Sequence, residues 1–235
     1  MCDESHDCYK EYDYEHEMPT RLLDVADPDN LKLVLSQDRT GEQSNKATTQ
    51  IKRYIALSHC WGKTKPGEIP SYCTTTKNIG TREKGFRTAD LPQTFQDAVE
   101  VAQGLGIQYL WIDSLCIIQG DGGDWDQESK RMEGVYTSAY CTLAATSAVN
   151  SNSGFLKRNV NSKCIYAQDK SGQQVYVCTD IADFDNEVEG AELNKRAWVM
   201  QERLLSCRTI HFGANQAYWE CGKGVYCEDL TLLEW

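Results

Sequence analysis

Residues 91–113 read LPQTFQDAVEVAQGLGIQYLWID. Apolar residues recur there at the i, i+3, i+4, i+7 spacing of one helical face, at Phe95, Ala98, Val99 and Ala102. Pro92 suits the first turn of such a helix, and Gly104 or Gly106 suits its end. Residues 107–113 are apolar on both faces, which is typical of a strand in a parallel sheet covered by helices. The stretch predicts a helix followed by a buried strand.

The neighbouring segments extend this unit. Residues 51–58 (IKRYIALS) read as a preceding strand, so strand, helix and strand form a βαβ unit with a right-handed crossover. CTLAAT (141–146) predicts a third buried strand. Asp124, with Gln127 three residues on, predicts a capping box for a helix over 125–139. We expect strands 54–58, 107–113 and 141–146 to lie parallel and adjacent in one sheet.

Antiparallel hairpins are expected around this core. RLLDV and LKLVLS flank the turn-rich DPDN, and CRTIHF and QAYWEC flank GAN. CIYAQ and QVYVC, joined by DKSGQ, form a hairpin inside an insertion at about 155–192. Asn194 is expected to cap a helix through RAWVMQERLL. The predicted fold class is α/β, with a small parallel sheet flanked by helices and added antiparallel β-hairpins.

Composition excludes several classes of protein. The 235 residues are 40% apolar and 25% charged, an ordinary globular balance. A net charge of −11 argues against a nucleic-acid-binding surface, because neutralising phosphates needs an excess of Lys and Arg. No stretch approaches the roughly 20 apolar residues of a membrane span, and the acidic N-terminus lacks the apolar run of a signal peptide. We therefore expect neither nucleic acid nor a membrane as a partner.

The eleven cysteines favour reduced thiols over a disulfide scaffold. Their number is odd, no secretory signal is present, and three lie in predicted strands: Cys141, Cys178 and Cys207. We expect the cytoplasm, a reducing compartment, with no disulfide among Cys60, Cys116 and Cys141. A zinc site is the alternative, at Cys2, His6 and Cys8 or at Cys221 and Cys227, although neither set has paired CxxC spacing.

Two carboxylates, Asp113 in WIDSLC and Glu202 in RAWVMQE, stand in apolar surroundings. Burying an unpaired carboxylate costs on the order of several kcal/mol, so each needs a partner or a function. Ligands of open α/β sheets bind outside the carboxyl ends of the strands. One crevice is therefore expected to contain the residues at two strand ends: Ser58, His59, Trp61, Asp113 and Ser114. The alternative is that Asp113 caps a turn through Ser114 or a backbone N–H.

Trp198 and Glu202 are four residues apart, hence on one helical face. The indole offers a flat surface for a purine or pyridinium ring, and the glutamate offers a fixed negative charge beside it. Arg196 opens the same stretch and is placed with Trp198 among the candidate ligand-binding residues. The alternative is a packing tryptophan, with Glu202 paired to Arg203 or to another basic residue.

Residues 62–90 lack periodicity and carry an excess of positive charge. Such a patch on an acidic protein attracts anionic ligands. The alternative is an ordinary solvated loop. Its basic residues are Lys63, Lys65, Lys77, Arg82, Lys84 and Arg87.

Three blocks, residues 54–62, 91–148 and 196–213, closely resemble the fungal heterokaryon incompatibility (HET) domain. They begin with YIALSHCWG, LPQTFQDAV and RAWVMQERL, stand in the family's order and, with MPTRLLDV upstream, cover most of residues 18–221. The resemblance implies fungal non-self recognition that ends in programmed cell death. Its partners would be a second copy of the chain on activation, or other domains and signalling proteins of the incompatibility system. We expect a loosely ordered segment at 1–18 and a single HET domain at 19–235, cut from a longer protein.

The HET family is similar, more distantly, to Toll/interleukin-1 receptor (TIR) domains. IALSHCWG resembles their first strand and its loop, FQDAVEVAQGLGIQYLWID a helix and second strand, and CTLAATS a third strand. RAWVMQE resembles the TIR pattern in which Trp precedes Glu by four. That glutamate is catalytic in NAD-cleaving TIR domains, which implies a catalytic role for Glu202. A TIR-like (flavodoxin-like) core is implied at about 51–206, and the 155–192 insertion departs from it.

One carboxylate suffices for cleaving NAD+. Hydrolysis of an ordinary glycoside takes two, because the leaving oxygen must be protonated. Nicotinamide leaves from a pyridinium as a neutral molecule, so stabilising the oxocarbenium-like ribosyl centre is the main task. The TIR resemblance therefore implies NAD+ or a related nucleotide as substrate, and no cofactor. The alternatives are a thiol hydrolase with Cys116 as nucleophile, His59 as base and Asp113 as orienter, and a non-catalytic self-associating adaptor.

Overall fold

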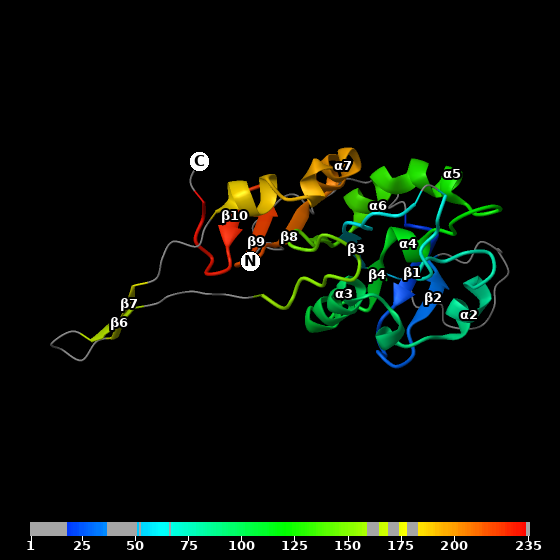
Figure 1. Ribbon diagram of the computed structural model, residues 1–235, viewed down its shortest axis with the longest axis horizontal. Helices are drawn as coiled ribbons and strands as arrows, with labels where there is room; N and C mark the ends of the chain where they lie inside the picture. The colour runs from blue at the N-terminus through cyan, green and yellow to red at the C-terminus, as the bar shows by residue number, and fades with distance from the viewer. Residues whose placement is uncertain are drawn as a thin grey trace.

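An eight-stranded sheet runs through the computed structural model of the protein, in the order β10-β9-β8-β5-β3-β4-β1-β2 (Figure 1). The structure describes residues 18–36, 51, 53–65, 67–158, 165–168, 174–177 and 183–233. The strands are β1 (Arg21–Asp24), β2 (Lys32–Leu35), β3 (Ile55–Ser58), β4 (Tyr109–Trp111), β5 (Cys141–Ala144), β8 (Arg208–Phe212), β9 (Ala217–Cys221) and β10 (Gly224–Cys227).

The centre of the sheet is parallel and its two margins are antiparallel. β3 lies between β4 and β5 and pairs with both in parallel, and β5 pairs in parallel with β8. The expected parallel, adjacent strands at 54–58, 107–113 and 141–146 are therefore confirmed. The hairpins at 21–36 and 207–221 are also confirmed.

The α/β class with added antiparallel hairpins is confirmed, but the sheet is larger than the small parallel sheet that the sequence predicted and is mostly antiparallel. The hairpin strands continue the same sheet, and four of its seven pairings are antiparallel. Backbone hydrogen bonding explains this, because the edges of β4 and β8 are covered by β1 and β9 and not left open. The four central strands run β4-β3-β5-β8, which is second, first, third, fourth in chain order among these four.

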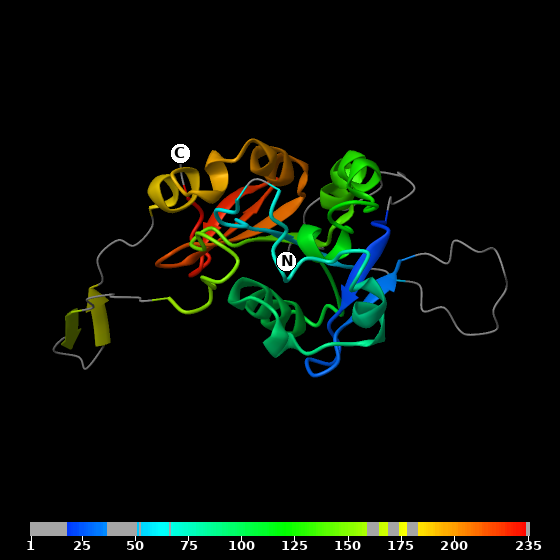
Figure 2. The ribbon, with the colours of Figure 1, turned by 45° about the vertical axis from the view of Figure 1, so that its right-hand side comes forward.

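Helices cover both faces of the sheet. They are α2 (Ile79–Lys84), α3 (Gln93–Gly104), α4 (Asp113–Cys116), α5 (Trp125–Glu128), α6 (Met132–Ser138) and α7 (Ala197–Leu205). Figures 1 and 2 show α3 on one side and α6 and α7 on the other. None of the helices in the described part of the chain is long and apolar enough to cross a membrane.

The alternation of β3 divides the core between these faces. Ile55 and Leu57 pack with Phe95 of α3 in one apolar cluster. Tyr54 and Ala56 point the other way and pack in a second cluster with the α6 side chains. Side chains point to alternate faces along a strand, so this alternation also decides which helix each residue just after β3 contacts.

Asp124 stands at the N-cap of α5 as predicted but its side chain does not cap the helix, and the predicted Asn194 cap is wrong. The Asp124 carboxylate accepts the Ile118 N–H at 2.8 Å and pairs with Arg21, and makes no cap hydrogen bond. The predicted 125–139 helix is α5, a 3-10 turn (Ser129–Arg131) and α6 in succession. Asn194 lies in a 3-10 turn (Leu193–Lys195) and donates to the Val188 carbonyl, so Arg196 stands at the N-cap of α7.

The expected hairpin of the insertion is confirmed as β6 (Ile165–Gln168) and β7 (Gln174–Val177), an antiparallel pair that forms its own sheet. Its DKSGQ connection and the acidic segment 1–17 lie outside the described residues. The elements that sequence reasoning missed include α2 within the aperiodic 62–90 stretch, the short helix α4 and the short strand β10.

Candidate functional site

The carboxyl end of β3 is the point where the chain order of the parallel strands reverses. β4 follows on one side of β3 and β5 lies on the other, and open sheets bind ligands at such a switch point. Ser58 continues the face of Tyr54 and Ala56, toward α6 and α7, and its hydroxyl donates to Oε2 of Glu202 at 2.5 Å. His59 continues the opposite face, and its ring meets Phe95 of α3 edge-on. Two predicted site residues thus reach opposite sides of one strand end.

Glu202 is buried within α7, with 7% of its surface exposed. Its helical neighbours Val199 and Ser206 face the sheet with it, because Val199 packs near Ala144 and the Ser206 hydroxyl meets that of Thr142 at 2.6 Å. Burial raises the pKa of Glu202 to about 7, further raised by Asp113 and opposed by the Ser58 hydrogen bond, Arg196 and Tyr136. At neutral pH this carboxyl is therefore divided between its acid and its ionised form.

Asp113 begins α4 just after β4 and holds Trp61. Its Oδ2 accepts the Trp61 indole N–H at 2.8 Å, and its Oδ1 accepts the Ser114 backbone N–H at 2.6 Å. His59 Nδ1 stands 3.9 Å from Oδ1, beyond hydrogen-bond reach. The structure therefore brings the HCWG loop and Asp113 together as predicted. The bond to Ser114 also shows the turn-capping contact that was the alternative.

Three buried polar atoms beside Asp113 have no hydrogen-bond partner among the described residues: His59 Nε2, Ser114 Oγ and Thr74 Oγ1. Thr74 adjoins the same turn, since its backbone N–H donates to the Ser114 carbonyl at 2.9 Å. Burial lowers the pKa of His59, opposed by Asp113 and supported by Arg196, so the imidazole is neutral at pH 7. Unpaired buried donors and acceptors are expensive, so such atoms are suited to a ligand hydroxyl or to water.

The other two predicted ligand-binding residues, Arg196 and Trp198, differ from each other in their surroundings. The Arg196 guanidinium donates to the His59 carbonyl at 2.5 Å and so anchors the HCWG loop to the start of α7. Trp198 is 57% exposed, whereas Glu202 one turn later is buried. The i, i+4 spacing puts two residues on one side of a helix, but here the face toward the sheet runs through Val199, Glu202 and Ser206.

Cys116 is poorly placed for the thiol-hydrolase alternative. It is 1% exposed and packs with Trp111 and Val135 in the cluster on the α6 face. Burial raises the pKa of its thiol to about 12, so a thiolate is absent at neutral pH. His59 packs on the α3 face of the sheet, so the two side chains lie on opposite sides.

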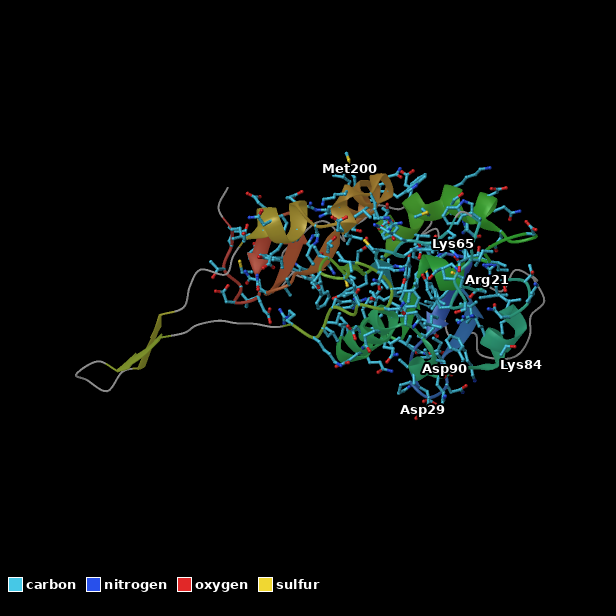
Figure 3. All side chains as sticks on the ribbon, viewed as in Figure 1. Arg21, Asp29, Lys65, Lys84, Asp90 and Met200 are labelled. Atoms are coloured by element: carbon cyan, nitrogen blue, oxygen red, sulfur yellow. The ribbon has the colours of Figure 1, made fainter. Side chains whose placement is uncertain are left out.

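The two arginines of 62–90 have partners within their own segment. Arg82 donates to the Tyr72 carbonyl at 2.5 Å and lies over the Phe86 ring, and Arg87 pairs with Asp90. Lys65 and Lys84 lie well apart in Figure 3. The arginines of this segment therefore serve its own packing.

Sequence reasoning missed Tyr136. This buried tyrosine of α6 lies near Glu202, and burial followed by the charge of Glu202 raises the pKa of its hydroxyl. Its position on a different helix gives no local signal in the sequence.

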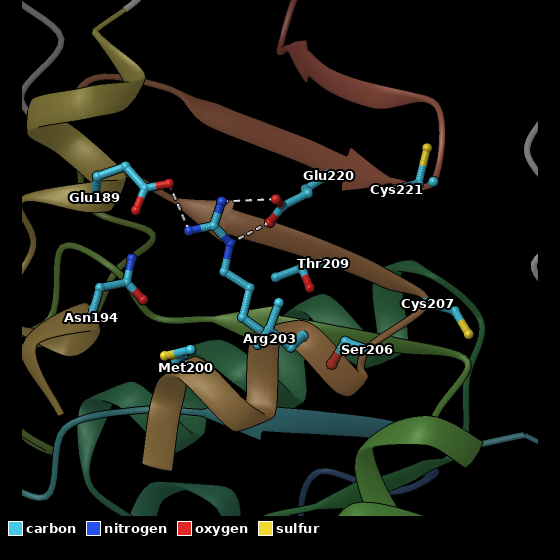
Figure 4. A pocket seen from close by; sticks show the side chains of 11 residues that line it. Glu189, Asn194, Met200, Arg203, Ser206, Cys207, Thr209, Glu220 and Cys221 are labelled. Carbon is cyan, nitrogen blue, oxygen red and sulfur yellow. Dashed lines mark hydrogen bonds and ion pairs between the residues drawn. The ribbon is translucent and has the colours of Figure 1, made fainter. Parts of the chain in front are cut away.

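Sequence reasoning also missed a groove of about 590 Å³ that is lined by residues of α7, β8 and β9 and not by Glu202 (Figure 4). Arg203 lies there between Glu189 and Glu220, at 2.8 and 2.7 Å, and Glu220 also meets His211 at 2.7 Å. Burial of Glu220 raises its pKa, but hydrogen bonds from His211 and Arg203 outweigh this and hold it at about 2. Each of these side chains pairs with another of the set, and the ion pairs connect α7 to β8 and β9. Arg203 therefore pairs with these glutamates and not with Glu202.

Among the described residues, no group of three His, Cys, Asp or Glu side chains is arranged to hold a metal ion. The Cys2, His6 and Cys8 set lies outside them. Cys60, Cys116 and Cys141 are buried, and none is in a disulfide.

Comparison with known proteins gives the family. The family model described as heterokaryon incompatibility protein (HET) matches residues 54–202, more than half of the chain. Searches of curated proteins and of solved structures found no significant match. The matched range runs from the residue before β3 to Glu202, so it contains every predicted site residue. The chain belongs to the heterokaryon incompatibility (HET) family.

Proposed function

We propose that this domain acts in heterokaryon incompatibility by hydrolysing NAD+ to nicotinamide and ADP-ribose products, with Glu202 as the catalytic residue and programmed cell death as the outcome. Family membership itself implies the role in heterokaryon incompatibility. The observation that carries the chemical part is Glu202, a buried carboxyl with a pKa of about 7, held at 2.5 Å by Ser58 at the switch point of the sheet. Strongly shifted carboxyls in such positions are candidates for catalysis.

The chemistry needs one fixed negative charge. When the bond between nicotinamide and ribose breaks, positive charge grows on the ribosyl centre, and an ionised Glu202 stabilises it. A low-dielectric site strengthens this effect, because few water molecules screen the charge. No group must protonate the leaving nicotinamide, since it departs neutral.

The neighbouring residues support this role. Ser114 Oγ, without a partner among the described residues, is suited to a ribose hydroxyl, whereas His59 faces Phe95 on the other side of the sheet. Asp113 holds Trp61, and Arg196 holds the His59 carbonyl, so the loop is fixed before substrate arrives. Tyr136 and Ser58 both favour the ionised form of Glu202.

The test is release of nicotinamide from NAD+ by the purified protein, followed by chromatography. Glu202→Gln keeps the shape and removes the charge, so the rate should fall by roughly 10² to 10³, or about 2.7–4 kcal/mol of transition-state stabilisation. Glu100→Gln, an exposed position on α3, is the matched control and should retain the full rate. Equal rates for the Glu202 variant and the wild type would make this carboxyl structural.

The second candidate is a non-catalytic adaptor that associates with a second copy of the chain. One observation favours it: Met200 and Leu204 lie one turn apart on α7, on the side away from Glu202, and are 66% and 73% exposed. Met200 projects outward from this helix in Figure 3. Apolar side chains exposed together mark interaction surfaces. A wild-type protein that releases no nicotinamide, yet forms oligomers that Leu204→Asp disperses, would favour this function over hydrolysis.

A further inference from the structure

A groove of about 660 Å³ lies beside the candidate site, on the far side of Trp61. It is lined by two tryptophans, two aspartates and the glycines of the loop between them: Trp61, Trp125, Asp121, Asp126, Gly120, Gly122 and Gly123, with Gln119. Trp61 lines this groove and also belongs to the candidate site, because its indole N–H donates to Asp113 at 2.8 Å. The groove is therefore a direct continuation of the site that contains Asp113.

The residues that line the groove determine which ligand charge it favours. No lysine or arginine is among the residues that line this groove, and its two carboxylates give it a formal charge of minus two. Phosphate groups are repelled by such a wall. Tryptophan faces attract cations through the ring quadrupole, and flat rings stack on them. The combination suits a flat aromatic cation.

The groove is formed before a ligand arrives. Gly123 N–H donates to the Gly120 carbonyl at 2.9 Å, and Asp124 N–H donates to the Ile118 carbonyl at 3.1 Å. The Asp124 carboxylate closes the same turn through the Ile118 N–H at 2.8 Å and is anchored by Arg21. A preorganised groove loses little conformational entropy on binding.

From this geometry we infer that the groove is a binding site for a flat aromatic cation of the N-alkylpyridinium class, with Trp125 and Trp61 as the aromatic side chains that contact it. This site is separate from the carboxyl of Glu202, which does not line the groove.

The experiment compares two probes on the intact protein, the 1-methylnicotinamide cation and neutral nicotinamide, by ligand-observed NMR titration. The cation should bind roughly tenfold more tightly than the neutral ring. Trp125→Ala should weaken cation binding roughly three- to tenfold, and Trp125→Phe should restore most of it. Trp125 is 41% exposed, so the fold tolerates its loss. The double variant Asp121→Asn, Asp126→Asn should reduce the preference for the cation, whereas Asp29→Asn, an exposed aspartate outside the groove, should not.

The possible outcomes separate the two proposals. Equal affinity for both probes, or full cation binding by Trp125→Ala, overturns the binding site even if Glu202→Gln abolishes cleavage. Binding of the cation that depends on Trp125, in a protein that releases no nicotinamide, supports the binding site and overturns the hydrolase. Binding of both probes by Glu202→Gln at wild-type affinity is expected, because Glu202 does not line this groove.

Discussion

At the scale of single residues, Glu202 and Ser58 form the contact on which the chemistry depends. The Ser58 hydroxyl donates to Oε2 of a carboxyl that burial would otherwise keep protonated well above its ordinary range. A hydrogen bond to the ionised form favours ionisation. The serine therefore sets how much of the glutamate is ionised at neutral pH.

Ser58→Ala should move the pH dependence of cleavage to higher pH. Without the hydrogen bond, the pKa of Glu202 rises above its value of about 7, so less of the carboxyl is ionised at pH 7. The midpoint of kcat/KM against pH, which reports groups of the free enzyme, should shift upward, with the rate recovering in alkaline buffer. Ser153→Ala, an exposed serine, is the control. An unmoved midpoint would show that this hydrogen bond does not tune Glu202.

Glu202 should also make stability depend on pH. Its folded pKa of about 7 lies above the ordinary 4.5, so the folded protein binds the extra proton between these values. The stabilisation is fully present below pH 4.5 and is lost as pH rises through 7, by roughly 3 kcal/mol at most. Urea unfolding at several pH values should therefore show Glu202→Gln gaining on the wild type between pH 4.5 and 8. Parallel stability curves would contradict the burial of an ionisable Glu202.

At the scale of elements, the loop between α4 and α5 depends on Gly123. A Cβ atom there would lie 2.1 Å from the Ile118 carbonyl oxygen and 2.9 Å from that of Gly120, and both are backbone atoms that cannot yield. Gly123→Ala should destabilise the protein by about 1–3 kcal/mol and disturb the tryptophan-lined groove. Gly80→Ala is the control, because that helical position has open space and alanine should be neutral or stabilising. Thermal unfolding measures both, and equal melting temperatures would contradict the crowding.

The sequence predicted those elements whose signals are local. α3 was predictable because its apolar period needs no partner, and the βαβ unit followed from apolar strands on either side. The caps failed because Asp124 pairs with Arg21, 103 residues away in the chain, and Asn194 with the Val188 carbonyl. No local pattern reveals such partners.

The candidate site was predictable to the same degree. Strand ends indicated that Ser58, His59, Trp61 and Asp113 lie together. Hydrogen bonds join Ser58 to Glu202 and Trp61 to Asp113, whereas the carbonyl of His59 accepts from Arg196. The orientation of α7 was not predictable, since its apolar Trp198 and Leu204 face outward and its glutamate inward. The apolar pattern alone predicts that Trp198 and Leu204 point toward the sheet. The packing of α7 against β3 and β5 instead turns Glu202 toward the sheet.

At the scale of the whole molecule, charge opposes the proposed substrate. The chain carries a net charge of −11, and NAD+ is itself a net anion, because two phosphate charges exceed one pyridinium charge. Like charges slow association through water, and salt screens the repulsion. The arginines of 62–90 do not reverse this locally, since Arg82 and Arg87 have partners of their own.

Binding of NAD+ should therefore strengthen with added salt, the reverse of ordinary electrostatic steering. As ionic strength rises from about 10 to 150 mM, the Debye length falls from roughly 30 to 8 Å, and kcat/KM at low substrate should rise about two- to threefold. The 1-methylnicotinamide cation should respond in the opposite direction, because the same field attracts it. Neutral nicotinamide is the control and should not respond. A kcat/KM that falls with salt would mean that the basic residues between 62 and 90 dominate the approach of the pyrophosphate, and the field of the whole chain would then be the lesser influence.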